Sequence, residues 1–211
     1  MNHKKIYKHR YLLVIWLILA IYVSTLIYIK LPFINISFDH NQTNKGLLSL
    51  LKLLIPDFSY ELKIYNIQVL IVWGCGILAG PKIGLITALI YIALGLLGLP
   101  IFSGGGGLSY IHEVTFGYLI SLPLLAYLSG KYFTENKKIL AISIPIFITH
   151  LMGVLYIIIF KGNYSSIAWH LSYSMIGYDL ILSFILYTPL SILSFFLTEM
   201  FTIEVPDPKE I

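Results

Sequence analysis

Long apolar segments with almost no charged residues dominate this sequence. Of its 211 residues, 58% are hydrophobic and 11% are charged, whereas a soluble domain has roughly 25% charged residues. One compact soluble core of this length cannot hide so much apolar surface, so lipid must solvate part of it. The segments are too long for barrel strands and do not alternate polar with apolar residues. The sequence therefore predicts an all-α integral membrane protein.

Six of these segments are long enough to approach the ~20 residues that a transmembrane helix needs. We expect one membrane domain, 1–211, joined by outer loops at 31–63, 98–113 and 161–175, and an acidic tail, Glu204–Ile211, that is mobile. In the first loop, Gly46–Ile55 is apolar but too short to span, which predicts an interfacial or cap helix. The predicted spans are 11–30, 64–79, 83–97, 114–130, 139–160 and 176–198.

The basic residues predict the orientation of this bundle. An even number of spans puts both termini on one side, and that side receives nine of the 14 lysines and arginines, against five on the other. Basic residues accumulate on the cytoplasmic side of membrane proteins, so both termini are expected in the cytoplasm. The same residues lie in short clusters that flank apolar runs instead of forming one basic face. This distribution indicates a membrane protein without a nucleic-acid partner.

Asp179 is the most informative single residue, because it lies near the start of the sixth span. A carboxylate at that depth costs several kcal/mol unless it is paired, so intramembrane acids are functional candidates. The alternative is an interfacial acid that caps its helix. Gln68, inside the second span, carries an amide that needs a partner in the bundle.

The glycines Gly104–Gly107 form the second candidate. Such a run can turn backbone N–H groups toward an anion or a polar solute, or it can simply make a flexible or sharp turn. His112 and Glu113 follow closely, but a zinc protease needs a second histidine at position 116, where Phe116 stands. We expect His150 to be an isolated structural or interfacial histidine. No phosphate-binding loop occurs, and no metal or cofactor site is predicted.

Several of these segments resemble the central signature of the BioY family, the substrate-capture (S) components of energy-coupling-factor biotin transporters. The resemblance covers about 64–190 and is specific over 68–107. Two further segments are similar to the family: the start of the fourth helix at Thr115–Leu119, and Asp179 near the start of the sixth helix. The segments that carry it are Gln68-Val-Leu, Leu78-Ala-Gly-Pro81, Leu94–Gly107, Thr115-Phe-Gly-Tyr-Leu119 and Asp179.

The resemblance implies a multi-pass protein of the bacterial cytoplasmic (inner) membrane with a pocket that faces outward. Its ligand would be biotin, it would have no enzymatic activity, and release would need an energy-coupling module: a transmembrane coupling subunit and two ATPases. Ala20 and Ser24 are similar to the small-residue stripe by which S components dock on the coupling subunit. The substrate-binding residues implied are Gln68, Gly104, Gly105, Gly106, Gly107, Tyr110, Thr115, Tyr118, Trp169 and Asp179.

Three features depart from the family pattern. The family has a lysine at the position of Leu182, and Glu113-Val-Thr115 replaces a Gly-Pro-Thr sequence. Losing a cation and gaining an acid disfavours an anionic ligand unless Lys161, a histidine or the loop amides compensate. The insertion at 37–59 is also unusual. Two alternatives therefore stay open: another small vitamin-like ligand, and a membrane enzyme whose Asp179, His112 and Glu113 converge on one cavity.

Overall fold

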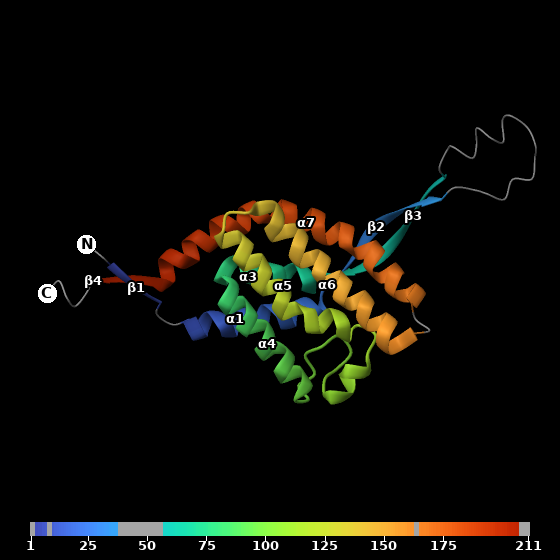
Figure 1. Cartoon of the computed structure of the whole chain (residues 1–211), viewed down its shortest axis with the longest axis horizontal. Coiled ribbons are helices and arrows are strands. Elements are labelled where there is room, and N and C mark those ends of the chain that lie inside the picture. Colours follow the sequence, from blue (N-terminus) through green and yellow to red (C-terminus); the bar gives the residue numbers. More distant parts are fainter. Residues whose placement is uncertain (1–2, 8–9, 38–56, 163–164, 207–211) are drawn as a thin grey trace, which may run out of the picture. The chain divides into compact units, whose positions relative to one another are not determined.

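The computed structural model describes residues 3–7, 10–37, 57–162 and 165–206, and six α-helices make up most of this part (Figure 1). A short 3-10 helix, η1 (Leu108–His112), follows α4. The helices are α1 (Arg10–Leu26), α3 (Gln68–Ala79), α4 (Pro81–Leu96), α5 (Phe116–Thr134), α6 (Lys138–Lys161) and α7 (Ser165–Phe201).

Local sequence explains the sharpest helix boundary. Gly80 has φ 80°, a left-handed conformation that glycine adopts without cost. Pro81 occupies the first position of α4, where its fixed φ suits a helix and its missing N–H leaves no donor unpaired. These two residues therefore end α3 and start α4 with a single-residue turn.

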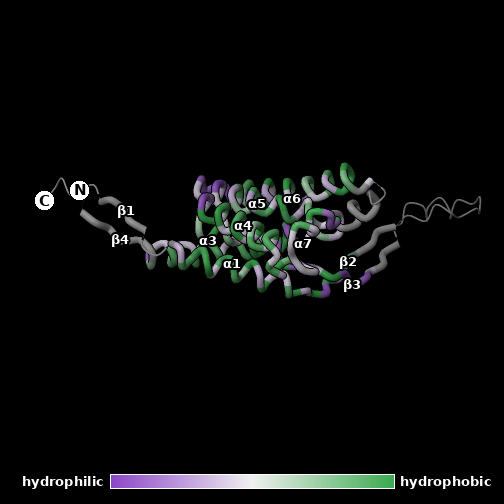
Figure 2. Tube along the Cα trace, turned by 90° about the horizontal axis from the view of Figure 1, so that it is seen from below, coloured by the Kyte–Doolittle hydropathy of each residue, from purple (hydrophilic) through white to green (hydrophobic). Residues whose placement is uncertain are grey.

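Hydrophobic residues predominate along the helices (Figure 2), and many of their large side chains are exposed. Trp16, Phe160 and Phe195 are each more than 60% exposed. Among the described residues, α6 and α7 each contain a stretch long and apolar enough to cross a membrane, and α1, α3 and α4 are shorter apolar helices. A large apolar exterior is the expected surface of a protein in contact with lipid.

Small residues bring α3, α4 and α5 close together. A Cβ atom on Gly76 would lie 2.1 Å from the Ala126 oxygen, and one on Gly84 would lie 3.0 Å from the Gly76 Cα. The indole Nε1–H of Trp73 donates to the Ala141 oxygen at 2.8 Å, and the Ser129 hydroxyl donates to the Trp73 oxygen at 3.0 Å. Small-residue packing and interhelical hydrogen bonds are typical of membrane helix bundles.

Two small sheets accompany the helices. Strand β1 (His3–Tyr7) pairs antiparallel with β4 (Thr202–Pro206), so that Lys5 lies opposite Glu204. Strand β2 (Tyr28–Ser37) pairs with β3 (Asp57–Asn66). The described residues between Tyr28 and Tyr65, which include β2 and all of β3 except Asn66, belong to a compact unit distinct from the rest of the chain.

These elements change several expectations. The helix of the first span ends at Leu26 instead of residue 30, because β2 begins at Tyr28. The second helix begins at Gln68 instead of 64, and the last begins at Ser165, inside the expected 161–175 loop. Residues 204–206 of the expected tail belong to β4, which begins at Thr202. The proposed cap helix Gly46–Ile55 and the insertion around it lie largely outside the described residues.

Candidate functional site

Asp179 and His150 form a buried hydrogen-bonded pair between α7 and α6. The Asp179 side chain is 1% exposed and His150 is 5% exposed. His150 Nε2 lies 2.9 Å from Asp179 Oδ2. A carboxylate only accepts hydrogen bonds, so this ring nitrogen carries the proton. The hydrogen bond with His150 offsets part of the cost of burying the Asp179 side chain.

The other ring nitrogen of His150 continues this contact into a chain of side chains. His150 Nδ1 lies 3.2 Å from the Ser172 hydroxyl oxygen, which lies 2.7 Å from the Tyr118 hydroxyl. The Tyr118 and His150 rings also meet edge to face, with centroids 5.9 Å apart. We call Tyr118, His150, Ser172 and Asp179 the buried polar network. It joins three helices, α5, α6 and α7.

Gly153 makes room for the Tyr118 end of this network. It lies on α6 one helical turn after His150, and a Cβ atom there would lie 2.3 Å from Cε1 of the Tyr118 ring. Real carbon atoms do not approach so closely without bonding. The ring therefore sits directly on the bare backbone of α6.

Gln68 belongs to a second polar cluster. Its Nε2 donates to the Tyr91 hydroxyl at 3.1 Å, and that hydroxyl donates to the Ile101 oxygen at 2.8 Å. Thr25 donates to the same oxygen at 3.4 Å. The expected partner of the Gln68 amide is thus Tyr91, and the cluster fastens α1, α3 and α4 to the segment that follows α4.

The glycine run forms a sharp turn. The Phe102 N–H donates to the Gly105 oxygen and the Gly105 N–H donates back to the Phe102 oxygen, at 2.9 and 3.1 Å. Gly104, Gly105 and Gly107 all have positive φ angles, between 96° and 135°. The Phe102 ring packs against Gly95, where a Cβ atom would lie 2.0 Å from the ring. The turn reading of this run is confirmed, and a ligand role for its backbone stays a prediction.

The remaining predicted ligand residues have different surroundings. Tyr110 is 8% exposed and donates to the Ser103 oxygen at 2.9 Å, and its hydroxyl lies 3.4 Å from that of Thr115, which is exposed. The side chain of Trp169 lies outside the described part of the chain. On α1, Ala20 is exposed, whereas Ser24 is 1% exposed and donates to the Ile21 oxygen.

One expectation about this site is wrong, and one of the open alternatives loses its basis. His150 is not isolated, because its partner Asp179 lies 29 residues further along the chain and only folding brings the two together. His112 and Glu113 do not join Asp179 in one cavity, because both are exposed while Asp179 is buried against His150. The membrane-enzyme alternative therefore loses the geometry that it required.

Ser172, His150 and Asp179 are connected in the order of a serine-hydrolase triad, but their setting is different. Ser172 lies inside α7, whose backbone N–H groups bond within the helix and so cannot serve as the oxyanion hole that acyl transfer requires. The arrangement can accept and donate hydrogen bonds to a polar ligand. It does not have the parts of a nucleophilic catalyst.

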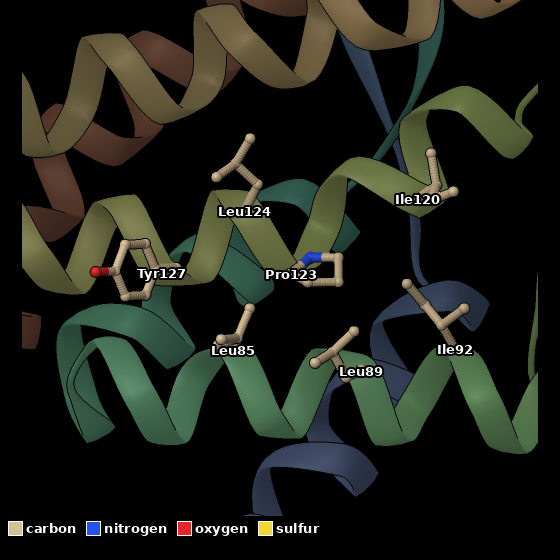
Figure 3. Close-up of a pocket in the computed structure, with 7 residues that line it drawn as sticks. All are labelled: Leu85, Leu89, Ile92, Ile120, Pro123, Leu124 and Tyr127. Carbon is tan, nitrogen blue, oxygen red and sulfur yellow. The ribbon is translucent and has the colours of Figure 1, made fainter.

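An apolar groove lies apart from these polar groups, between α4 and α5 (Figure 3). Its volume is about 380 Å³, and no predicted ligand residue lines it. An almost wholly apolar lining suits a hydrocarbon chain and does not suit a ureido group. The lining residues are Leu85, Leu89, Ile92, Ile120, Pro123, Leu124 and Tyr127.

The chain is similar to known biotin transporters in sequence and in fold. It is 42% identical over 66 residues to the probable biotin transporter BioY of Lysinibacillus sphaericus, covering 31% of this chain and 34% of that protein. It is 37% identical over 84 residues to the probable biotin transporter BioY of Pyrococcus horikoshii, covering 36% and 52%. These alignments thus span between a third and a half of the length of the relatives.

A solved structure has the same fold. The crystal structure of the S-component for biotin from an ECF-type ABC transporter matches with a TM-score of 0.58 and 17% identity, over 90% of this chain and 89% of that chain. The model of the BioY family matches residues 60–197, which run from β3 through most of α7 and contain the whole buried polar network. Since that match covers well over half of the sequence, the chain belongs to the BioY family.

Proposed function

We propose that this protein captures biotin at the outer face of the bacterial cytoplasmic membrane, as the S component of an energy-coupling-factor transporter. Family membership supports a transport function, and the named relatives support biotin as the ligand. The observation that carries the proposal is the buried Asp179, which His150 holds at 2.9 Å in an otherwise apolar bundle.

The chemistry of biotin suits this carboxylate. The ureido ring of biotin offers two N–H donors and one carbonyl acceptor, and an ionised carboxylate accepts N–H donors strongly. Tyr118, at the other end of the network, offers a hydroxyl and an aromatic face. Tyr118 and Trp169 would pack against the apolar rings of the ligand. Gln68, Tyr110, Thr115 and the backbone of Gly104–Gly107 are proposed as the remaining contacts.

The proposal includes a membrane topology. Six helices would cross the membrane, a cap helix would lie in the first outer loop, and both termini would be cytoplasmic. The antiparallel pairing of β1 with β4 supports one part of the last point, because it puts residues 3–7 and 202–206 on the same side. The exposed apolar side chains of α1, α6 and α7 support lipid contact along these helices.

Energy would come from other subunits, because the sequence contains no phosphate-binding loop. We propose that a transmembrane coupling subunit with two ATPases docks along α1 at Ala20, the exposed member of the small-residue pair; Ser24, which is 1% exposed, would have to be uncovered to share in this contact. The Ser24 hydroxyl bonds to its own helix at the Ile21 oxygen, so this side chain occupies little more space than an alanine. Small residues of this kind allow two helices to approach closely.

Calorimetric titration of the purified protein with biotin tests the proposal. Micromolar or tighter binding is expected, and Asp179→Asn should weaken it by about 1.5–3 kcal/mol, the value of a hydrogen bond to a charged group. Glu135→Gln is the matched control, because it removes an exposed acid from the turn between α5 and α6 and should leave affinity unchanged. No binding by the wild type, or equal affinity in Asp179→Asn, would contradict the proposal.

A second candidate ligand is another small vitamin-like molecule on the same scaffold. Leu182, one helical turn after Asp179, is apolar and packs against the core, so this turn of α7 offers no cation to a carboxylate ligand. Mass spectrometry of the small molecule that co-purifies with the protein separates this candidate from biotin. Biotin in the spectrum supports the first proposal, and a different molecule supports the second.

A further inference from the structure

The buried acid of the candidate site is held by a histidine from a neighbouring helix. Asp179 and His150 are both almost fully buried, and the hydrogen bond between them joins α7 to α6. Leu182, the next residue on the same face of α7, is apolar. A buried polar side chain is costly unless it is hydrogen-bonded. The 2.9 Å hydrogen bond with His150 is therefore one contact that fixes where the Asp179 carboxyl group lies.

The His150 ring is itself held on three sides. The carboxylate accepts from Nε2, the Ser172 hydroxyl lies 3.2 Å from Nδ1, and the Tyr118 ring packs edge to face against the imidazole. Ser172 is in turn bonded to Tyr118 at 2.7 Å. A ring that is bonded at both nitrogens cannot flip or turn without breaking one of these bonds. Its direction toward Asp179 is thus fixed by side chains from α5 and α7.

We propose that His150 is a positioning residue for ligand binding. Its 2.9 Å hydrogen bond holds the Asp179 carboxylate in one orientation, and Ser172 and Tyr118 keep His150 in place. This inference rests on the proposed function, in which Asp179 accepts a hydrogen bond from the ureido group. His150 acts on the ligand through Asp179 and needs no contact of its own.

A double-mutant cycle tests this role, because two residues that act through one another give non-additive effects. Biotin affinity is measured by calorimetry for the wild type, His150→Leu, Asp179→Asn and the double variant. We expect His150→Leu to weaken binding by about tenfold or more in the wild type, the loss expected for a charge-assisted hydrogen bond. In the Asp179→Asn background it should have an effect of about twofold or less, within the additivity error of such cycles.

The conservative variant His150→Gln separates positioning from packing. A glutamine keeps an N–H donor that can reach the carboxylate, so it should recover most of the affinity that His150→Leu loses. An equal loss from His150→Leu in both backgrounds would overturn the proposal, because it would mean that the ring only fills space. No rescue by His150→Gln together with an additive cycle would overturn it as well.

Ser172→Ala is a second test, which leaves both partners of the His150–Asp179 hydrogen bond in place. It removes the hydroxyl that contacts His150 Nδ1 and should weaken biotin binding by about threefold to tenfold, as for an ordinary buried hydrogen bond. Ser194→Ala is its matched control. Ser194 also lies on α7, is also 7% exposed, and donates to the Ile77 oxygen at 2.9 Å, away from the network. Equal biotin affinity in Ser172→Ala and Ser194→Ala would mean that Ser172 does not hold His150 in place, and it would overturn the proposal.

The wild-type titration separates the two levels of inference. A wild type that binds biotin while His150→Leu and Ser172→Ala bind equally well leaves the proposed function intact and overturns the positioning role alone. A wild type that does not bind biotin overturns the proposed function, and the positioning role falls with it.

Discussion

Replacing Gly153 by alanine should push Tyr118 out of the buried polar network. The new methyl carbon would lie 2.3, 2.4 and 2.5 Å from three carbons of the Tyr118 ring. Non-bonded carbons rest at about 3.5–4.0 Å, so the ring must retreat by roughly 1 Å. A retreat of that size breaks the 2.7 Å contact between the hydroxyls of Tyr118 and Ser172.

The energetic terms give the size of the effect. Overpacking of this kind costs about 1–3 kcal/mol, and the lost hydrogen bond adds about 0.5–1.5 kcal/mol. The alanine restores about 0.5–1 kcal/mol of helix propensity. The net expectation is about 2 kcal/mol of lost stability, which for a chain of this size lowers the Tm by roughly 4–8 °C.

Gly177→Ala is the matched control for Gly153→Ala. Gly177 also lies inside a helix, α7, and a Cβ atom there would meet nothing within 4 Å. It should therefore gain helix propensity without a clash. Thermal unfolding in detergent compares the two variants, and calorimetry with biotin follows the site. Equal Tm values for both variants would refute the reasoning, because the close approach of Tyr118 to α6 would then be of no consequence.

Two further predictions concern the loop after α4 and the turn between α5 and α6. Gly95→Ala should expel the Phe102 ring, since the added carbon would lie 2.0 Å from it, and hydrogen exchange of the glycine run should speed up; unchanged exchange would contradict this. The hydrogen bond from Lys137 lowers the pKa of Glu135 in the folded protein. Its contribution to stability is therefore fully present above the pKa of the unfolded acid and is lost as pH falls through the lowered pKa. Lys137→Met should raise the pKa of Glu135 toward its ordinary value in an NMR titration, whereas stability at neutral pH should hardly change because both groups are exposed.

Local sequence predicted the helices best where strong boundary signals occur. Gly80 and Pro81 mark the end of α3 and the start of α4, and the lysines at 137 and 138 mark the start of α6. The sequence predicts a loop at 31–63, whereas the structure has most of β2 and of β3 there. In β3, Phe58, Tyr60, Leu62 and Ile64 alternate with other residues, and this period of two was the signal that could have found the strand.

The candidate site shows where sequence reasoning ends. The cost of a buried charge identified Asp179 from its position alone. It could not name the partner, because His150 is on another helix and its own neighbours in the sequence, Thr149 and Leu151, give no hint of a charge nearby. Ser172 was hidden for a different reason. It lies in a segment rich in serine and tyrosine that reads as a loop, whereas α7 already begins at Ser165.

The β1–β4 ladder has a consequence for how this protein is made. Residues 3–7 leave the ribosome before the six helices of the described part, and their partners at 202–206 leave it after them. The first strand therefore has no partner while all six helices are synthesised, and the ladder can close only after the bundle is complete. Pairing between such distant segments is slow, since a long loop must close before any contact forms. Closure of the ladder would thus be a late folding step, and a fusion at one terminus should disturb the strand at the other.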